Sequence, residues 1–137
     1  MRSIVKYINE KLHIGQFKKE QELSDIEIED LKDKLKGVNI NDLSRDLNMS
    51  PAVQEKHRQK MEGYFNKGSK PSRLVATIKD KQKLIARWRE AIYLEWDSAV
   101  HEFTEEIIKR NYYTKEQLQK YILNNILSNN PKMKKYL

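Results

Sequence analysis

The chain has 137 residues, of which 38% are apolar and 34% charged, and its 27 lysines and arginines against 20 acids give a net charge of +7. It contains no cysteine, which excludes disulfides, thiol nucleophiles and cysteine-based zinc sites. No stretch approaches the ~20 apolar residues that span a bilayer, and the N-terminus lacks the apolar run of a secretory signal. We therefore expect neither a membrane partner nor secretion, and the excess of positive charge favours a polyanionic partner.

The first expected element is an amphipathic helix over residues 3–12. Its apolar stripe is formed by Ile4, Val5, Ile8 and Leu12. A polar connection follows, and we expect residues 1–23 to form a mobile helix and linker ahead of the main domain.

A second helix is expected to start at Ser24, because Glu27 follows three residues later at the spacing of a capping box. Gly37 is the expected stop. Residues 22–33 carry six acids and one lysine. The sequence leaves open whether this acidic segment folds over the basic part of the chain and masks it.

Two further helices are expected in the middle of the chain. Asn41 precedes a short helix with Leu43 and Leu47, and Ser50 caps a longer one with Pro51 at its first position, extending to about Phe65. We expect Val53, Met61, Tyr64 and Phe65 to face inward. Residues 66–72, with the sequence NKGSKPS, are predicted to form a loop.

The longest periodic region lies in the second half of the chain. Apolar residues recur every seven positions at Ile78, Ile85, Ile92 and Ala99. This spacing predicts one helix over about 81–110, about 45 Å long at ~1.5 Å per residue. Trp88 and Trp96 fall on the same face, which is typical of a core stripe or of a seam for a second chain.

Thr114 is expected to cap a final helix, and residues 129–137 to form a basic tail. No convincing strand is present. The sequence therefore predicts a single all-α domain over residues 1–137, a small multi-helix bundle around the long helix.

Positive charge is concentrated in residues 56–89, which hold eleven bases and two acids. Cations without neighbouring acids suit phosphate, because each neutralised phosphate releases counterions. The predicted nucleic-acid-binding residues are Lys56, Arg58, Lys60, Lys67, Lys70, Arg73, Lys79, Lys81, Lys83, Arg87 and Arg89. Tyr64 is a candidate for stacking on a base, although helical phase also allows it to be a core anchor. The plainer alternative is that these lysines and arginines only solvate the surface.

Residues 40–61 resemble a helix-turn-helix. The positions that match its pattern are Leu43, Ser44, Leu47, Asn48 and Met49, followed by Ser50-Pro51-Ala52 at the start of a recognition helix. The resemblance implies that Gln54, Lys56, His57 and Arg58 face the major groove. It departs from the pattern at Val53, which lies one position early, and at His57, which occupies an apolar position.

The first ten residues, MRSIVKYINE, resemble the capsid-targeting head of internal head proteins in large tailed phages. The matching positions are Met1, Arg2, Ser3, Tyr7, Ile8 and Glu10. Ile8-Asn9-Glu10 also resembles the site that a head-maturation protease cuts after glutamate, which makes Tyr7, Ile8 and Glu10 the expected targeting and cleavage residues. Lys11 departs from the small residue usual after the cut. The resemblance implies a phage protein in the cytoplasm of an infected bacterial host and in the virion interior, with capsid and portal proteins as partners.

Catalytic patterns are weak. The stretch HEFTE (101–105) lacks the second histidine of a zinc-protease motif. Asp97, His101 and Glu105 share one helical face, an arrangement more typical of surface ion pairs than of a metal site. We expect no enzyme, no metal and no cofactor.

The sequence thus predicts a non-enzymatic basic protein that binds nucleic acid, DNA rather than RNA, through residues 56–89 and is packaged with a phage genome. The alternative is a protein–protein module, such as a virion component, an adaptor or a host-factor inhibitor, that uses the Trp88/Trp96 face. Homo-oligomer formation through that face is compatible with either.

Overall fold

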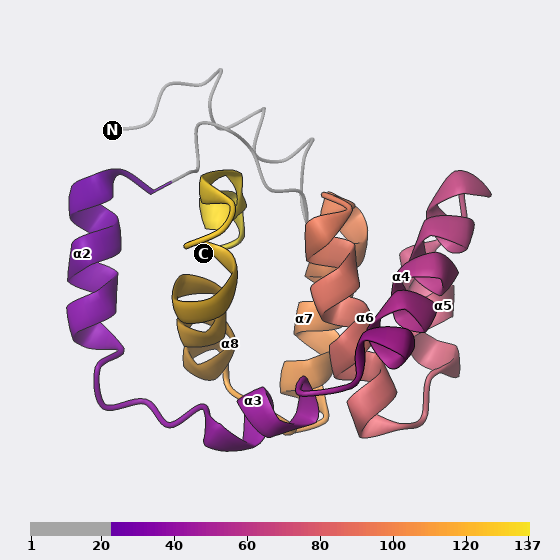
Figure 1. Ribbon diagram of the computed structural model, residues 1–137, viewed down its shortest axis with the longest axis horizontal. Helices are drawn as coiled ribbons and strands as arrows, with labels where there is room; N and C mark the ends of the chain where they lie inside the picture. The colour runs from indigo at the N-terminus through magenta and orange to yellow at the C-terminus, as the bar shows by residue number, and fades with distance from the viewer. Residues whose placement is uncertain (1–22) are drawn as a thin grey trace.

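The computed structural model describes residues 23–137 (Figure 1). The helix expected over 3–12 and the residues Tyr7, Ile8 and Glu10 lie outside this part of the chain. The described residues form helices and turns without a strand, so the prediction of an all-α, multi-helix protein is confirmed.

The elements follow one another with short connections. In chain order they are α2 (Asp25–Lys34), α3 (Asn41–Asp46), α4 (Pro51–Asn66), α5 (Pro71–Thr77), α6 (Lys81–Tyr93), α7 (Asp97–Lys109), α8 (Lys115–Tyr121), the π-helical turn η2 (Ile122–Ile126) and the 3₁₀ helix η3 (Pro131–Tyr136).

Helix α6 is the centre of the domain. It lies between α4 and α7 (Figure 1), and every residue from Leu84 to Ile92 is buried. Helices α4 and α5 form one end of the molecule and α2 the other (Figure 1). Most buried apolar side chains belong to one core around α6 and α7, and a smaller cluster of Ile28, Leu35 and Leu123 attaches α2.

The helix starts agree closely with the capping signals. Ser24 and Glu27 form the expected capping box, Ser50 accepts a hydrogen bond from the N–H of Val53, and Thr114 caps α8. Each of these side chains satisfies a backbone donor that the first turn of a helix leaves without a partner.

The prediction of one long helix over 81–110 is wrong, because the chain reverses at residues 94–96. The N–H of Glu95 donates to the carbonyl of Ile92 and that of Trp96 to Ala91 (3.0 and 3.1 Å), with Glu95 in the left-handed region at φ 54°. This is a Schellman turn, which ends α6 by satisfying its last carbonyls. Helix α7 therefore folds back against α6, and the indole N–H of Trp88 donates to Thr104 across the pair (3.0 Å).

Three other predictions need correction. Residues 71–77 form α5, whose Leu74 and Val75 are buried, so the expected loop is limited to 67–70. On α4, Met61 is buried, but Val53 and Phe65 are 41% and 44% exposed. The expected tail at 129–137 is packed against the domain through Met133 and Tyr136.

Two glycines near the end of α4 should respond oppositely to alanine. Gly63 lies within the helix and Gly68 is in the left-handed region at φ 68°; a Cβ at either position meets no atom within 4 Å. We expect Gly63→Ala to stabilise the fold by about 1 kcal/mol through helix propensity. Gly68→Ala should destabilise it by about 1 kcal/mol, because the left-handed region is strained for other residues. Urea unfolding of the two variants checks this, and a shift of the same sign in both would contradict the turn geometry.

Candidate nucleic-acid interface

Seven of the eleven predicted cations are exposed and lie without a carboxylate partner among the described residues. We call this set the cationic surface: Lys56, Lys60, Lys67, Lys70, Arg73, Lys79 and Lys83. They come from α4, the α4–α5 turn, α5 and the start of α6, which the fold gathers at the end of the molecule opposite α2 (Figure 1).

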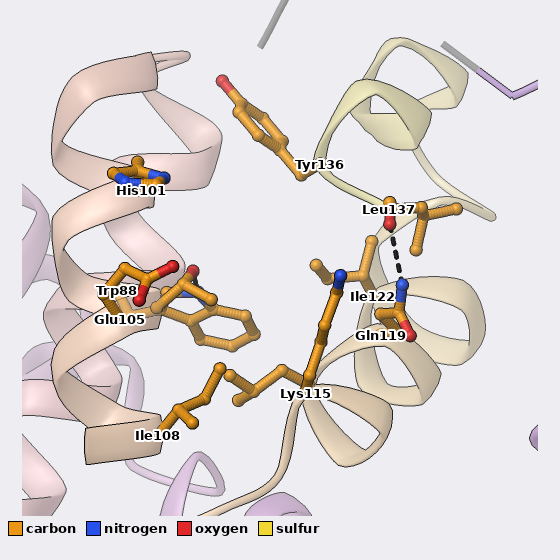
Figure 2. A pocket seen from close by; sticks show the side chains of 11 residues that line it. Trp88, His101, Glu105, Ile108, Lys115, Gln119, Ile122, Tyr136 and Leu137 are labelled. Carbon is orange, nitrogen blue, oxygen red and sulfur yellow. Dashed lines mark hydrogen bonds between the residues drawn. The ribbon is translucent and has the colours of Figure 1, made fainter. Parts of the chain in front are cut away.

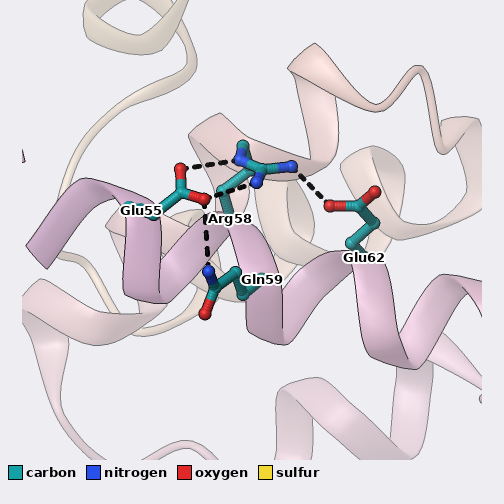
Figure 3. Close-up of polar contacts among 4 residues, drawn as sticks. All are labelled: Glu55, Arg58, Gln59 and Glu62. Carbon is teal, nitrogen blue, oxygen red and sulfur yellow. Dashed lines mark hydrogen bonds and ion pairs between the residues drawn. The ribbon is translucent and has the colours of Figure 1, made fainter. Parts of the chain in front are cut away.

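The acids of this region are already engaged. Arg58 pairs with both Glu55 and Glu62 along α4, and its Nε donates to Glu55 at 2.8 Å (Figure 3). Asp80 accepts from the backbone N–H of Lys83 at 2.7 Å and so caps α6. None of the three carboxylates therefore forms an ion pair with a side chain of the cationic surface.

Two predicted cations are exposed but paired. Glu55 and Glu62 hold Arg58 on both sides and raise its pKa, first through the hydrogen bond from Arg58 to Glu55. Lys81 lies 3.5 Å from Asp46 and 4.8 Å from the centre of the Tyr113 ring. Both residues are therefore less available to phosphate than the sequence predicted.

The assignment of Arg87 and Arg89 to an exposed track is wrong. Their side chains lie between α6 and its neighbours and are only 8% and 6% exposed. Arg89 donates to the carbonyl of Leu47 at the end of α3 (3.0 Å) and contacts Glu90 at 3.4 Å. It therefore ties α3 to α6, while burial raises the pKa of Glu90 despite this pairing.

Tyr64 lies at the junction of α4 and α5. Its side chain, half-buried, lines a groove of about 390 Å³ together with Ser69, Lys70, Arg73, Leu74 and Thr77. The guanidinium carbon of Arg87 lies 5.9 Å from the centre of the Tyr64 ring. The ring thus lies between the exposed groove and the buried arginine. No local sequence pattern predicts this contact, because it depends on how α4, α5 and α6 pack.

His57 faces the α4–α6 contact and is surrounded by positive charge. Its pKa is lowered by burial and then by Arg87, Arg89, Lys83 and Lys56. A base with a lowered pKa in the folded state stabilises the fold above its ordinary value of ~6.5, and this stability is lost as the pH falls below that value, when only the unfolded chain takes up the proton. We expect the free energy of unfolding to fall between pH 7.5 and 5, and His57→Gln to make this fall smaller. Urea unfolding at several pH values measures it, and an identical pH dependence in the variant would contradict this assignment.

The helix-turn-helix segment forms two helices, α3 and α4, joined by the capped turn at 47–50. Three of the four side chains expected in the major groove are hydrogen-bonded, ion-paired or half-buried. Gln54 donates to the carbonyl of Met49 (2.9 Å), Arg58 is paired, and His57 is half-buried. Lys56 remains exposed. This favours contact with phosphates over the reading of base edges.

A second cavity, of about 260 Å³, lies between α6–α7 and α8–η3 (Figure 2). The indole of Trp88 and the side chains of Ile108 and Ile122 form its apolar wall, while Glu105 and Lys115 reach it from opposite sides (Figure 2). No residue of the cationic surface lines it.

The face predicted from Trp88 and Trp96 is not available to a partner in this fold. Trp88 is fully buried and Trp96 is 8% exposed, because α7 folds back and covers the stripe. The acidic segment also lies away from the cationic surface: α2 occupies the far end of the molecule (Figure 1).

Within residues 23–137, none of the helices combines the length and apolar character that a membrane crossing requires. The same part of the chain contains no cluster of three or more histidine and carboxylate side chains that could hold a metal ion. Comparison with known protein families, curated proteins and solved structures found no match. Function therefore has to be inferred from the site itself.

Proposed function

We propose that this protein binds nucleic acid, DNA in preference to RNA, by contacting backbone phosphates with the cationic surface, and that it is not an enzyme. The observation that supports this most strongly is the engagement of Glu55, Glu62 and Asp80 in local contacts. Seven exposed cations at one end of the molecule have no ion-pair partner among the described residues, which is the arrangement that displaces counterions from a phosphate backbone.

The proposed binding is independent of base sequence. Exposed lysines act as point charges that suit phosphates of any sequence, whereas the side chains that could read bases from α4 are mostly occupied within the protein. Packaging with a phage genome would need such sequence-independent binding. That extension of the proposal rests on the resemblance of the first ten residues alone.

The test is binding to random-sequence DNA, followed by fluorescence anisotropy at about 50 mM salt, where electrostatic contacts are strongest. We expect binding to duplex DNA of any sequence with similar affinity, and weaker binding to RNA of the same length. Absence of binding would overturn the proposal. A preference of more than ~100-fold for one palindromic site would instead support the helix-turn-helix reading.

A further inference from the structure

Arg87 is a buried arginine whose charge is not balanced by any contact in the described structure. The residue is 8% exposed, yet it has no ion-pair or hydrogen-bond partner among residues 23–137, and its Nε is buried. Its guanidinium carbon lies 5.9 Å from the centre of the Tyr64 ring. A buried cation without a compensating anion is costly, so a partner for this group is expected.

The surroundings of Arg87 reinforce this expectation. His57, on the facing side of α4, has its own buried ring nitrogen, Nδ1, without a partner. Arg87 exerts the largest electrostatic effect of the four cations that act on His57, and Lys83 and Lys56 add further positive charge. The nearest acid on α6, Glu90, is held by Arg89 instead. The region around Arg87 and His57 therefore offers several hydrogen-bond donors and little negative charge.

We propose that Arg87 and His57 form a binding subsite for one phosphate group between α4 and α6, with the ring of Tyr64 as its wall. A guanidinium matches the geometry of a phosphate with two parallel hydrogen bonds. A ring nitrogen of His57 supplies a further donor, and Lys83 and Lys56 attract the anion to the opening. The phosphate reaches Arg87 from the solvent side, where 8% of the residue remains exposed.

The subsite adjoins the cationic surface through Tyr64, Lys70 and Arg73, which line one groove. Where the phosphate belongs to a DNA backbone, the inference rests on the proposed function. A free phosphate or a phosphorylated small molecule carries the same chemistry. The experiment therefore uses both inorganic phosphate and DNA.

The full-length chain, labelled with ¹⁵N and ¹³C, is titrated with inorganic phosphate against sodium chloride of equal ionic strength. We expect saturable changes at the Nε–H of Arg87 and at the ring of His57, together with a rise in the measured pKa of His57, because the anion stabilises its charged form. Chloride should not reproduce these changes. Equal responses to chloride, or no saturable response to phosphate, would overturn the subsite.

Arg87→Lys keeps the charge and loses the planar fork, so we expect it to weaken phosphate binding at least about tenfold. The matched control is Arg58→Lys, because Arg58 is on the neighbouring helix but already paired, and its phosphate affinity should equal that of the wild type. Unchanged affinity in Arg87→Lys would overturn the subsite. The wild-type titration tests the inference even if Arg87→Lys fails to fold.

Titration with duplex DNA separates the two proposals. Changes at Arg87 and His57 with both phosphate and DNA support the subsite as part of the DNA interface. Changes with phosphate alone support the subsite and assign it to a free phosphate-bearing ligand. DNA binding that perturbs Lys67, Lys70 and Arg73 while Arg87 and His57 respond to neither ligand overturns the subsite and leaves the proposed function in place.

Discussion

Reversing the charge of Lys67, Lys70 and Arg73 together to glutamate should lower the affinity for random-sequence DNA by about 100-fold or more. These three residues lie in the α4–α5 turn and at the start of α5, are exposed, and have no carboxylate partner in the described structure. The change removes three phosphate contacts and adds repulsion at the same place. Anisotropy at low salt measures the loss, and circular dichroism checks that the helices persist.

The control places the same change in charge elsewhere. Lys32, Lys34 and Lys36 are exposed on and after α2, at the far end of the molecule (Figure 1). Reversing all three alters the net charge equally, so a loss of affinity in this variant as large as in the first would show that total charge, not the cationic surface, governs binding. We expect at most a few-fold decrease, since these residues lie remote from the site and salt screens their field.

Trp88→Ala should destabilise the protein by about 3–5 kcal/mol, the usual cost of removing a large aromatic side chain from a core. Trp88 is fully buried, donates a hydrogen bond to Thr104, and its ring centre lies 6.1 Å from that of Tyr121. Since domains of this size are stable by about 5–15 kcal/mol, the loss should be large in urea unfolding.

Phe65→Ala is the matched control for this variant. Phe65 is 44% exposed and touches Trp96 only edge-on, with ring centres 5.4 Å apart. Its removal should cost about 1 kcal/mol or less, the value of one aromatic pair with little additional burial. Similar losses in both variants would mean that Trp88 does not lie in the core and would restore it as a candidate docking residue.

The local signals in the sequence predicted more of the fold than its long-range pattern did. Ser24, Ser50 and Thr114 cap helices where expected, because capping depends on a few neighbouring residues. The seven-residue spacing correctly selected Ile78, Ile85, Ile92 and Ala99 as core residues. It did not show that the helix breaks, because residues on both sides of the turn at Glu95 enter the same core. A Schellman turn without glycine leaves no obvious sequence mark.

The candidate site was predictable in its location but not in its members. A count of charges found the basic region, and seven of its residues are exposed without acids. Contacts within the fold decide which of these cations are unavailable to phosphate, and a count of charges does not reveal those contacts. Arg58 is bound by Glu55 and Glu62 on its own helix, whose spacings at three and four residues could have been noticed. Arg89 is bound by the carbonyl of Leu47, and Arg87 is largely buried because α6 packs against its neighbours, and both facts require the tertiary structure.

The salt dependence of DNA binding tests the central claim most directly. The logarithm of the association constant for duplex DNA should fall linearly with the logarithm of salt concentration, by about 0.9 for each phosphate neutralised. Replacing Lys67, Lys70 and Arg73 with glutamine should make this slope shallower by about 2.7 if each residue contacts one phosphate. The same slope in the wild type and the variant, or wild-type binding that hardly responds to salt, would show that the cationic surface is not where this protein meets nucleic acid.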